Sequence, residues 1–212
     1  MAIHKRLTRR ILLTGGATAL AVGVSAGVAL AVAITFSISP GGAITANAGK
    51  TTLKDTATGS VLSCTSSSSK GTLKSGHGIS GTNLGSITQL SFSNCTGPFG
   101  LTFNVTNSGF PWTLHGTAFN ATTGVTTGNI TGIKSHLAGT GCAADVAGAT
   151  AGSTGKVKVT YTNSTHKLKV LATGGNLHVW NVAGCAGLIH SDDVTQFVGT
   201  YTVSPTQKIT SP

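Results

Sequence analysis

Short runs of alternating apolar and polar residues recur along most of the chain, separated by clusters of Gly, Asn and Ser. Runs with this period of two, bounded by turn residues, predict β-strands. The expected strands are Ser60–Cys64, Gly71–Lys74, Ile87–Ser93, Leu101–Thr106, Trp112–Phe119, Asn129–Leu137, Cys142–Val146, Lys156–Thr162, Lys167–Thr173, Asn176–Val182 and Gln196–Val203. About 9–11 short strands predict an all-β fold, either an antiparallel sandwich or a barrel. One short helical turn is expected around Leu188–Asp193.

One expected hairpin can be assigned in register. The strands Lys156–Thr162 and Lys167–Thr173 are joined by four residues. Aligning their apolar faces pairs Val159 with Val170 and places each lysine of the outer face opposite an uncharged residue. A slip by one residue would turn the lysines towards the core, so the pattern specifies the register strongly.

The N-terminal part of the chain has a different pattern. Four basic residues lie between Lys5 and Arg10, and no ionisable side chain occurs from Ile11 to Ser39. This order is typical of a secretory signal helix with a positive start and an apolar centre. We expect a signal peptide over residues 1–48, cleaved after Ala48, and a single β domain over residues 49–212. Cleavage after Ala31 and an uncleaved membrane anchor are the alternatives.

The basic segment also bears on the export route. Thr8-Arg9-Arg10-Ile11-Leu12-Leu13 resembles the twin-arginine export motif, in which a paired arginine precedes apolar residues. Paired arginines are common in any basic signal start, so the general secretory route is the alternative. In either case we expect a secreted, extracellular protein, with the cell envelope as a second possible location.

Removing the signal segment changes the charge of the chain. The whole sequence has a formal charge of +10, and ten lysines and four aspartates follow residue 48, which leaves +6. Every arginine lies before residue 48. The expected mature part therefore has no guanidinium group, which is the side-chain group that binds phosphate in a bidentate manner. Nucleic acid is therefore a disfavoured partner, and a cell-wall polymer or an extracellular ligand is preferred.

All four cysteines lie in the expected mature part. An even number of cysteines in an exported chain predicts disulfides. Of the three possible connectivities we expect Cys64–Cys95 with Cys142–Cys185, because each bond then lies within one half of the chain. No two cysteines have the short spacing of a zinc knuckle, so the sequence predicts neither a metal site nor a cofactor.

Four lysines of the hairpin form the first candidate site, a basic surface of Lys156, Lys158, Lys167 and Lys169. Such a surface can bind an anionic polymer by counterion release. The favoured interpretation is a solvated face that discourages edge-to-edge aggregation.

The second candidate is a ligand-binding pair, His178 and Trp180, which share one face of an expected strand. An indole beside a titratable donor is suited to stacking with a sugar ring or another flat ligand. A buried second layer, or a tryptophan that covers a disulfide, is the more common role of such a pair.

The third candidate is catalytic. Acid–base or nucleophilic chemistry would have to use His190 with Asp192 or Asp193, within the segment His190-Ser-Asp-Asp193. The segment is more typical of a turn in which an aspartate accepts backbone hydrogen bonds. No G-x-S-x-G nucleophile motif is present, so no catalytic residue is assigned.

The order of basic signal, Gly/Ser/Thr-rich β domain and two disulfides resembles uncharacterised exported β-proteins of high-GC Gram-positive bacteria. This resemblance implies the fold and the location but no functional residue. The sequence thus predicts a secreted, disulfide-stabilised binding or cell-surface module. A secreted hydrolase and a structural envelope component are the alternatives.

Overall fold

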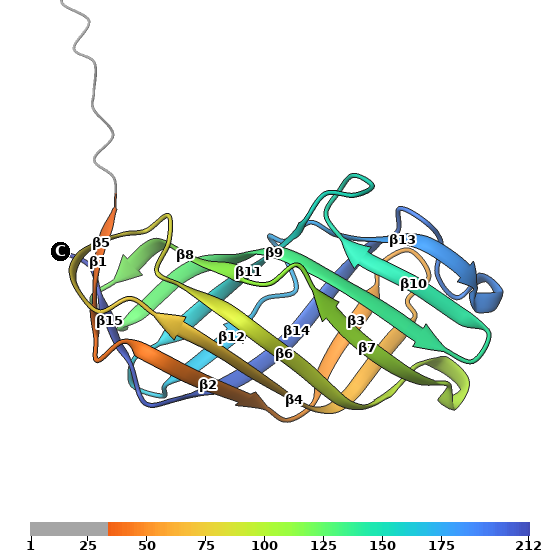
Figure 1. Cartoon of the computed structure of the whole chain (residues 1–212), viewed down its shortest axis with the longest axis horizontal. Helices are drawn as coiled ribbons and strands as arrows, with labels where there is room; N and C mark the ends of the chain where they lie inside the picture. The colour runs from red at the N-terminus through yellow and green to blue at the C-terminus, as the bar shows by residue number, and fades with distance from the viewer. Residues whose placement is uncertain (1–33) are drawn as a thin grey trace, which may run out of the picture. The chain divides into compact units, whose positions relative to one another are not determined.

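The computed structural model describes residues 34–212, which form 15 β-strands and two short 3-10 turns (Figure 1). The strands are β1 Thr35–Ser39, β2 Gly42–Ala48, β3 Thr51–Asp55, β4 Val61–Leu73, β5 Gly76–Ser80, β6 Gly85–Thr96, β7 Thr102–Ser108, β8 Trp112–Asn120, β9 Val125–Gly139, β10 Cys142–Ala147, β11 Gly155–Thr162, β12 Lys167–Val170, β13 Leu177–Gly184, β14 Val194–Ser204 and β15 Lys208–Thr210. The turns are η1 Pro98–Gly100 and η2 Cys185–Gly187. The expected all-β class is confirmed.

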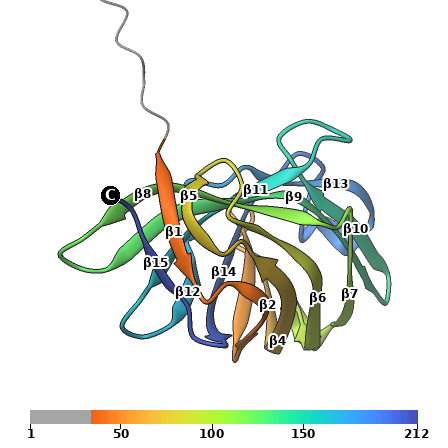
Figure 2. The same ribbon diagram turned by 60° about the vertical axis from the view of Figure 1, so that its left-hand side comes forward.

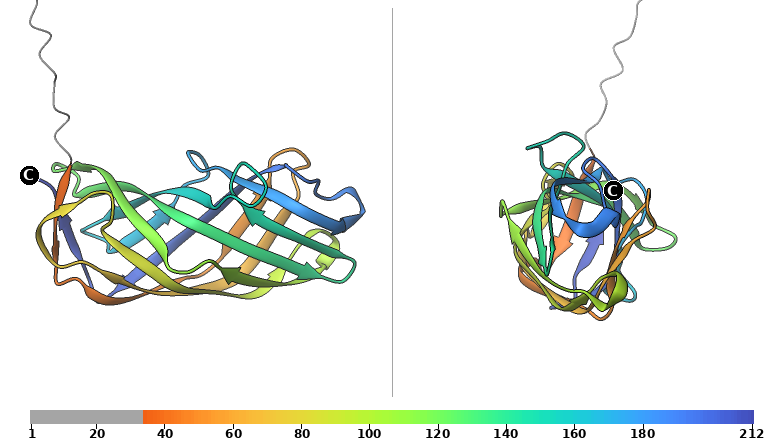
Figure 3. Two further views of the ribbon diagram at one scale, coloured as in Figure 1. Left: turned by 45° about the horizontal axis from the view of Figure 1, so that its top comes forward. Right: turned by 90° about the vertical axis from the view of Figure 1, so that its right-hand side faces the viewer.

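Four long strands, β4, β6, β9 and β14, run through the domain and are shared by two closed rings. At one end the ring is β3, β4, β6, β7, β9, β10, β13 and β14. At the other end it is β2, β4, β6, β8, β9, β11, β12 and β14. All of these pairings are antiparallel, so the domain is an elongated barrel, seen along its axis in the right-hand view of Figure 3.

Both disulfides lie in the first ring, which we call the disulfide end. Cys64 pairs directly with Cys95, and the bonds Cys64–Cys95 and Cys142–Cys185 are both formed, as expected. One cross-strand row runs from Cys95 through Phe103 and Gly139 to Cys142. The two bonds therefore fasten the same level of the barrel wall at two places.

A three-stranded sheet of β15, β1 and β5 lies at the opposite end, which we call the cap end (Figures 1 and 2). Its central strand buries Phe36 and Ile38 almost completely. Gln207, which is 2% exposed, accepts a hydrogen bond from the Gly41 N–H, and its carbonyl accepts one from the Tyr161 hydroxyl. These contacts attach the β1–β2 connection and the segment before β15 to the barrel.

The expected domain start is corrected by these strands. β1 and β2 both precede residue 49, and β2 pairs with β4 and β14 inside the second ring. Ala46 and Ala48, the small residues of the expected cleavage site, are buried in that strand. The β domain therefore extends at least to residue 34. The twin-arginine-like stretch and the alternative site at Ala31 lie outside the described residues.

The expected hairpin is confirmed in register, with Val159 opposite Val170 and Thr160 opposite Lys169. Two other expectations are wrong. The serine run between Cys64 and Lys70 continues a single strand, β4, instead of separating two. The helical turn expected at Leu188–Asp193 lies earlier in the chain, as η2, and Ser191 and Asp192 form a non-helical turn instead. In residues 34–212 no helix has the length and apolarity needed to cross a membrane.

Candidate functional site

The middle of the barrel contains an apolar cavity of about 90 Å³. Its walls come from strands of both rings and include Leu62, Leu90, Ile130, Trp112 and Phe197. Inward-facing residues of a small barrel normally fill its interior. Here the interior is incompletely filled.

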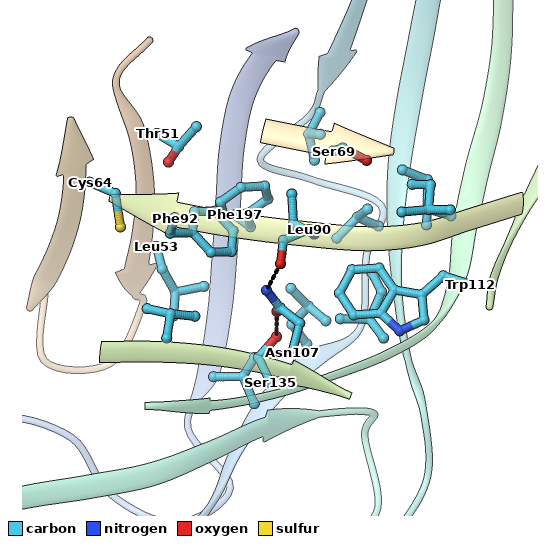
Figure 4. A pocket seen from close by; sticks show the side chains of 18 of the residues that line it. Thr51, Leu53, Cys64, Ser69, Leu90, Phe92, Asn107, Trp112, Ser135 and Phe197 are labelled. Atoms are coloured by element: carbon cyan, nitrogen blue, oxygen red, sulfur yellow. Dashed lines mark hydrogen bonds between the residues drawn. The ribbon is translucent and has the colours of Figure 1, made fainter. Parts of the chain in front are cut away.

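One part of the cavity wall is a seam between β6 and β7, where Leu90 and Asn107 lie side by side (Figure 4). Within the described residues, β6 pairs with β7 only at Cys95 and Thr96 and with β8 only from Gly85 to Ile87. The stretch between them has no ladder partner on that side. Its inward-facing side chains Leu90 and Phe92 remain half-buried, as does Val105 across the seam.

One side chain bridges the seam. Asn107 donates from Nδ2 to the Leu90 carbonyl at 2.9 Å, and its Oδ1 accepts from the Ser135 hydroxyl at 2.6 Å. Figure 4 shows this chain of bonds beside the cavity. A side-chain bridge replaces the backbone ladder here, so the wall can part at lower cost than a paired sheet.

Aromatic side chains shape the cavity rigidly. Phe92 and Phe197 meet edge to face with centroids 5.7 Å apart, and Phe110 stacks on Trp112 at 4.7 Å. The Trp112 indole N–H donates to the Ser108 carbonyl at 2.9 Å. Ring contacts of this kind fix the walls.

The interior also contains polar groups. The Ser67 hydroxyl donates to the Tyr201 hydroxyl at 2.8 Å, and burial raises the pKa of Tyr201 to about 12. Thr51 is 1% exposed and its hydroxyl has no hydrogen-bond partner within the described part of the chain.

Two smaller cavities extend the space along the barrel. One of about 50 Å³ lies at the disulfide end and shares Leu53, Leu62 and Leu137 with the central cavity. One of about 60 Å³ lies towards the cap end and shares Leu168 with it. The barrel thus contains a row of three cavities separated by single layers of side chains.

The predicted pair His178 and Trp180 lies on the outer face of β13. The two rings are nearly parallel, at 14°, with centroids 6.3 Å apart. The Trp180 N–H is bound to the Gly148 carbonyl at 2.9 Å, and His178 Nδ1 contacts Asp192 Oδ1 at 2.8 Å. The structure brings the pair together but neither shows nor tests a ligand.

A second histidine–carboxylate pair lies across β10 from Trp180. His136 Nδ1 is 2.7 Å from Asp145 Oδ1, and Asp145 pairs with Trp180 in the ladder. The Asn181 amide donates to the other Asp145 oxygen at 2.7 Å and, with His136, lowers the pKa of that carboxyl, although partial burial opposes the shift. This second pair was not predicted, because the strand spacings alone do not align β9, β10 and β13.

Of the predicted catalytic residues, the structure brings His190 and Asp193 together and places Asp192 with His178 instead. Asp192 binds His178, whereas Asp193 accepts the His190 backbone N–H at 2.6 Å and lies 3.3 Å from its Nδ1. The Asp193 contact is the turn that the sequence favoured. The structure therefore divides His190, Asp192 and Asp193 between two separate pairs.

The predicted basic surface is present on β11 and β12. Lys158, Lys167 and Lys169 are exposed, and Lys156 is half-buried. The neighbours that face these lysines across the ladders are Thr or Asn, as in the pairs Lys169–Thr200 and Lys158–Asn129. No group of three metal-ligating side chains occurs anywhere in residues 34–212.

The cavity and its seam were missed by the sequence reasoning. A signal for them does exist, since Asn107 and Ser135 interrupt the apolar faces Phe103–Val105 and Ile133–Leu137. A polar residue within such a face predicts an interior hydrogen bond. No family model, curated protein or solved structure matches the chain.

Proposed function

We propose that this protein is an exported binding protein whose barrel takes up the apolar end of a small amphiphile through the seam between β6 and β7. The observation that supports this function is the apolar cavity, whose wall includes a stretch of β6 without a ladder partner on the side of β7. The two disulfides are typical of an oxidising, extracellular environment and support the location.

The size of the cavity limits the part of the ligand that can enter. An engineered cavity of about 150 Å³ in another protein holds one benzene molecule. A cavity of about 90 Å³ is therefore large enough for a few carbon atoms. Each methylene transferred from water contributes about 0.8 kcal/mol, so a chain end of this size provides useful affinity.

The remainder of the ligand would lie outside, along the seam. The outward-facing residues there are Ser91, Ser93, Asn104 and Thr106, which are exposed and uncharged. These hydroxyl and amide groups are suited to a polar, uncharged head group that forms hydrogen bonds. The ligand class is thus a neutral amphiphile with a flexible apolar end.

Trp112 provides a direct test because its ring lines the cavity. In a Trp180→Phe background, Trp112 is the one remaining tryptophan of the chain. An acylglycerol with a brominated chain end should quench its fluorescence saturably, since bromine quenches only on close contact. The same lipid without bromine should compete.

Two matched variants separate entry from surface binding. Val105→Phe fills the inner rim of the seam, whereas Thr106→Phe adds a ring to the outer face of the same strand. Val105→Phe should abolish saturable quenching and Thr106→Phe should retain it. Equal quenching in both variants, or no saturable quenching in the folded parent protein, would contradict the proposed function.

A further inference from the structure

The small cavity at the disulfide end differs in its chemistry from the other two. Its walls are mainly apolar and include Leu53, Phe103, Val179 and Ile189. Three polar side chains also line it: Ser60, which is half-buried, and Asp55 from β3 and Thr195 from β14, which are cross-strand neighbours.

Asp55 and Thr195 are buried and incompletely bonded. Asp55 is 2% exposed and Thr195 is 6% exposed. Asp55 Oδ2 and Thr195 Oγ1 have no hydrogen-bond partner among the described residues. Two hydrogen-bond acceptors of this cavity are therefore unsatisfied.

The other Asp55 oxygen, Oδ1, accepts hydrogen bonds of the kind that stabilise a carboxylate. Oδ1 accepts the backbone N–H groups of Ala57 and Thr58 at 2.8 and 2.9 Å. Backbone donors stabilise negative charge, yet they leave Oδ2 without a donor. No Lys, Arg or His is among the described residues that line this cavity.

An unpaired buried carboxylate oxygen is far more costly than an unpaired hydroxyl. The central cavity and the cap-end cavity each contain one unpaired threonine hydroxyl, Thr51 and Thr126. A single water molecule can satisfy such a hydroxyl. The disulfide-end cavity is the one of the three that combines a hydroxyl with a carboxylate.

The walls restrict which cation can bind to that carboxylate. A hard metal ion such as calcium requires about six or more oxygen ligands, whereas this cavity has three polar side chains, Asp55, Ser60 and Thr195, among leucine, valine and phenylalanine. An ammonium group needs only hydrogen-bond acceptors, and an attached alkyl group would contact the apolar walls. An alkylammonium ion therefore fits both the acceptors and the walls.

We propose that the disulfide-end cavity binds a primary ammonium group carried on a short alkyl chain, with Asp55 Oδ2 and Thr195 Oγ1 as its hydrogen-bond acceptors. Because this cavity measures about 50 Å³, the ammonium group and the first carbon of the chain would occupy it, and the remaining carbons would extend past Leu188 and Ile189, which are half-buried and lie in the segment after η2. This site is independent of the seam site.

The test uses butylammonium chloride as the probe, with sodium butyrate and ammonium chloride as controls at equal ionic strength. Butylammonium should bind saturably in calorimetry and shift the amide signals of Asp55 and Thr195 in NMR spectra. Butyrate should leave these signals unchanged, because its charge has the wrong sign. Ammonium chloride should bind more weakly, because it lacks the alkyl group.

Two isosteric variants test the acceptors. Asp55→Asn keeps an oxygen for the Ala57 and Thr58 N–H groups but removes the charge, and it should weaken butylammonium binding by about tenfold or more. Thr195→Val should weaken it by about threefold. Thr126→Val, which removes a hydroxyl in the cap-end cavity, should leave it unchanged.

Equal binding of butyrate and butylammonium would overturn the proposal. So would unshifted Asp55 and Thr195 signals at a saturating probe concentration, or unchanged affinity in Thr195→Val. If Asp55→Asn does not fold, the probe comparison and Thr195→Val still decide. Quenching of Trp112 by the brominated lipid reports only on the seam site. A negative result at one site therefore leaves the proposal for the other site unaffected.

Discussion

The two ends of the barrel are closed in different ways. At the disulfide end, two covalent bonds fasten neighbouring strands of the wall, and the interior keeps a cavity with unpaired acceptors. At the cap end there is no disulfide within the described residues, and the first and last strands lie across the barrel. The Asn163 amide bonds the Ile209 backbone in both directions, at 2.7 and 2.9 Å.

This difference shows how one wall can combine stability with space. Covalent bonds restrain the unfolded chain and do not require a filled interior. Packing and buried hydrogen bonds act only when the groups are in contact, so the cap end depends on β1 and β15 being in place, even though a cavity of about 60 Å³ remains beside them. We therefore expect the cap end to depend on the completeness of the chain and the disulfide end on the redox state.

The largest effect should come from removing the strands that precede residue 49. A chain that starts at Gly49 lacks β1 and β2. The side chains of Ile209 and Val203, and the other core residues that surround Ile38, would then be exposed to water. It should lose cooperative thermal unfolding, whereas a chain that starts at Ile34 should keep it. Circular dichroism on both proteins makes this comparison.

The same reasoning predicts the processed N-terminus. Intact-mass analysis of the exported protein should place its first residue at or before residue 34. A stable mature chain that begins at Gly49 would contradict the role assigned to β1 and β2.

The next largest effect should come from the disulfides. The loops they close span 31 and 43 residues. By the loop-entropy relation, replacing each cysteine pair with alanine should lower the free energy of unfolding by about 3.5 to 4 kcal/mol. Urea titrations of the two variants measure this change.

Hydrogen exchange should then localise the weakening. In the disulfide variants, amide hydrogens of the disulfide-end ring, such as that of Val179, should exchange faster than in the parent protein. The amide hydrogen of Val203 near the cap should be accelerated less. Equal acceleration at both ends would show that the two ends are not separable units.

A smaller effect is expected at alkaline pH. The chain's two tyrosines, Tyr161 and Tyr201, are both buried towards the cap side, and burial raises the pKa of each, to about 12 for Tyr201. Because the folded state holds the proton more tightly than the unfolded state, stability should fall as pH rises above about 10. For Tyr201 alone the loss by pH 12 is about 2 kcal/mol.

Urea titrations between about pH 8 and pH 12 measure this loss. Tyr201→Phe should be less stable at pH 8, because Ser67 loses its partner, but should show a shallower decline above pH 10. An identical decline in the variant and the parent would assign the alkaline effect to other groups.

The elements that the sequence predicted well are those with strong alternation. The Lys156–Val170 hairpin was predicted in register because a slip would bury lysines. The disulfide pairing was also predicted correctly, because each bond joins strands that are close in sequence. Local patterns thus determined local pairings.

The elements that were missed depend on distant partners. The sequence of β1 resembles the end of a signal segment because Ile34–Ile38 continues an apolar run, and its pairing with β5 and β15 makes it a strand. The serines of β4 resemble a linker, yet Ser67 faces inwards to bond Tyr201, which is 134 residues later. The cavities were likewise not predictable, since their walls combine side chains from many strands.

The pairing of β1 with β15 also orders the assembly of the fold. Ser37 lies beside Thr210, so the cap cannot form until nearly the whole chain has been synthesised. Contacts of such long sequence separation are slow to form, whereas the strand pair that carries Cys64 and Cys95 is complete far earlier. A chain that crosses a membrane from its N-terminus would therefore close this barrel last at β1, and the edge of β1 that faces β15 must stay unpaired and protected until then, even if β5 has already paired with the other edge.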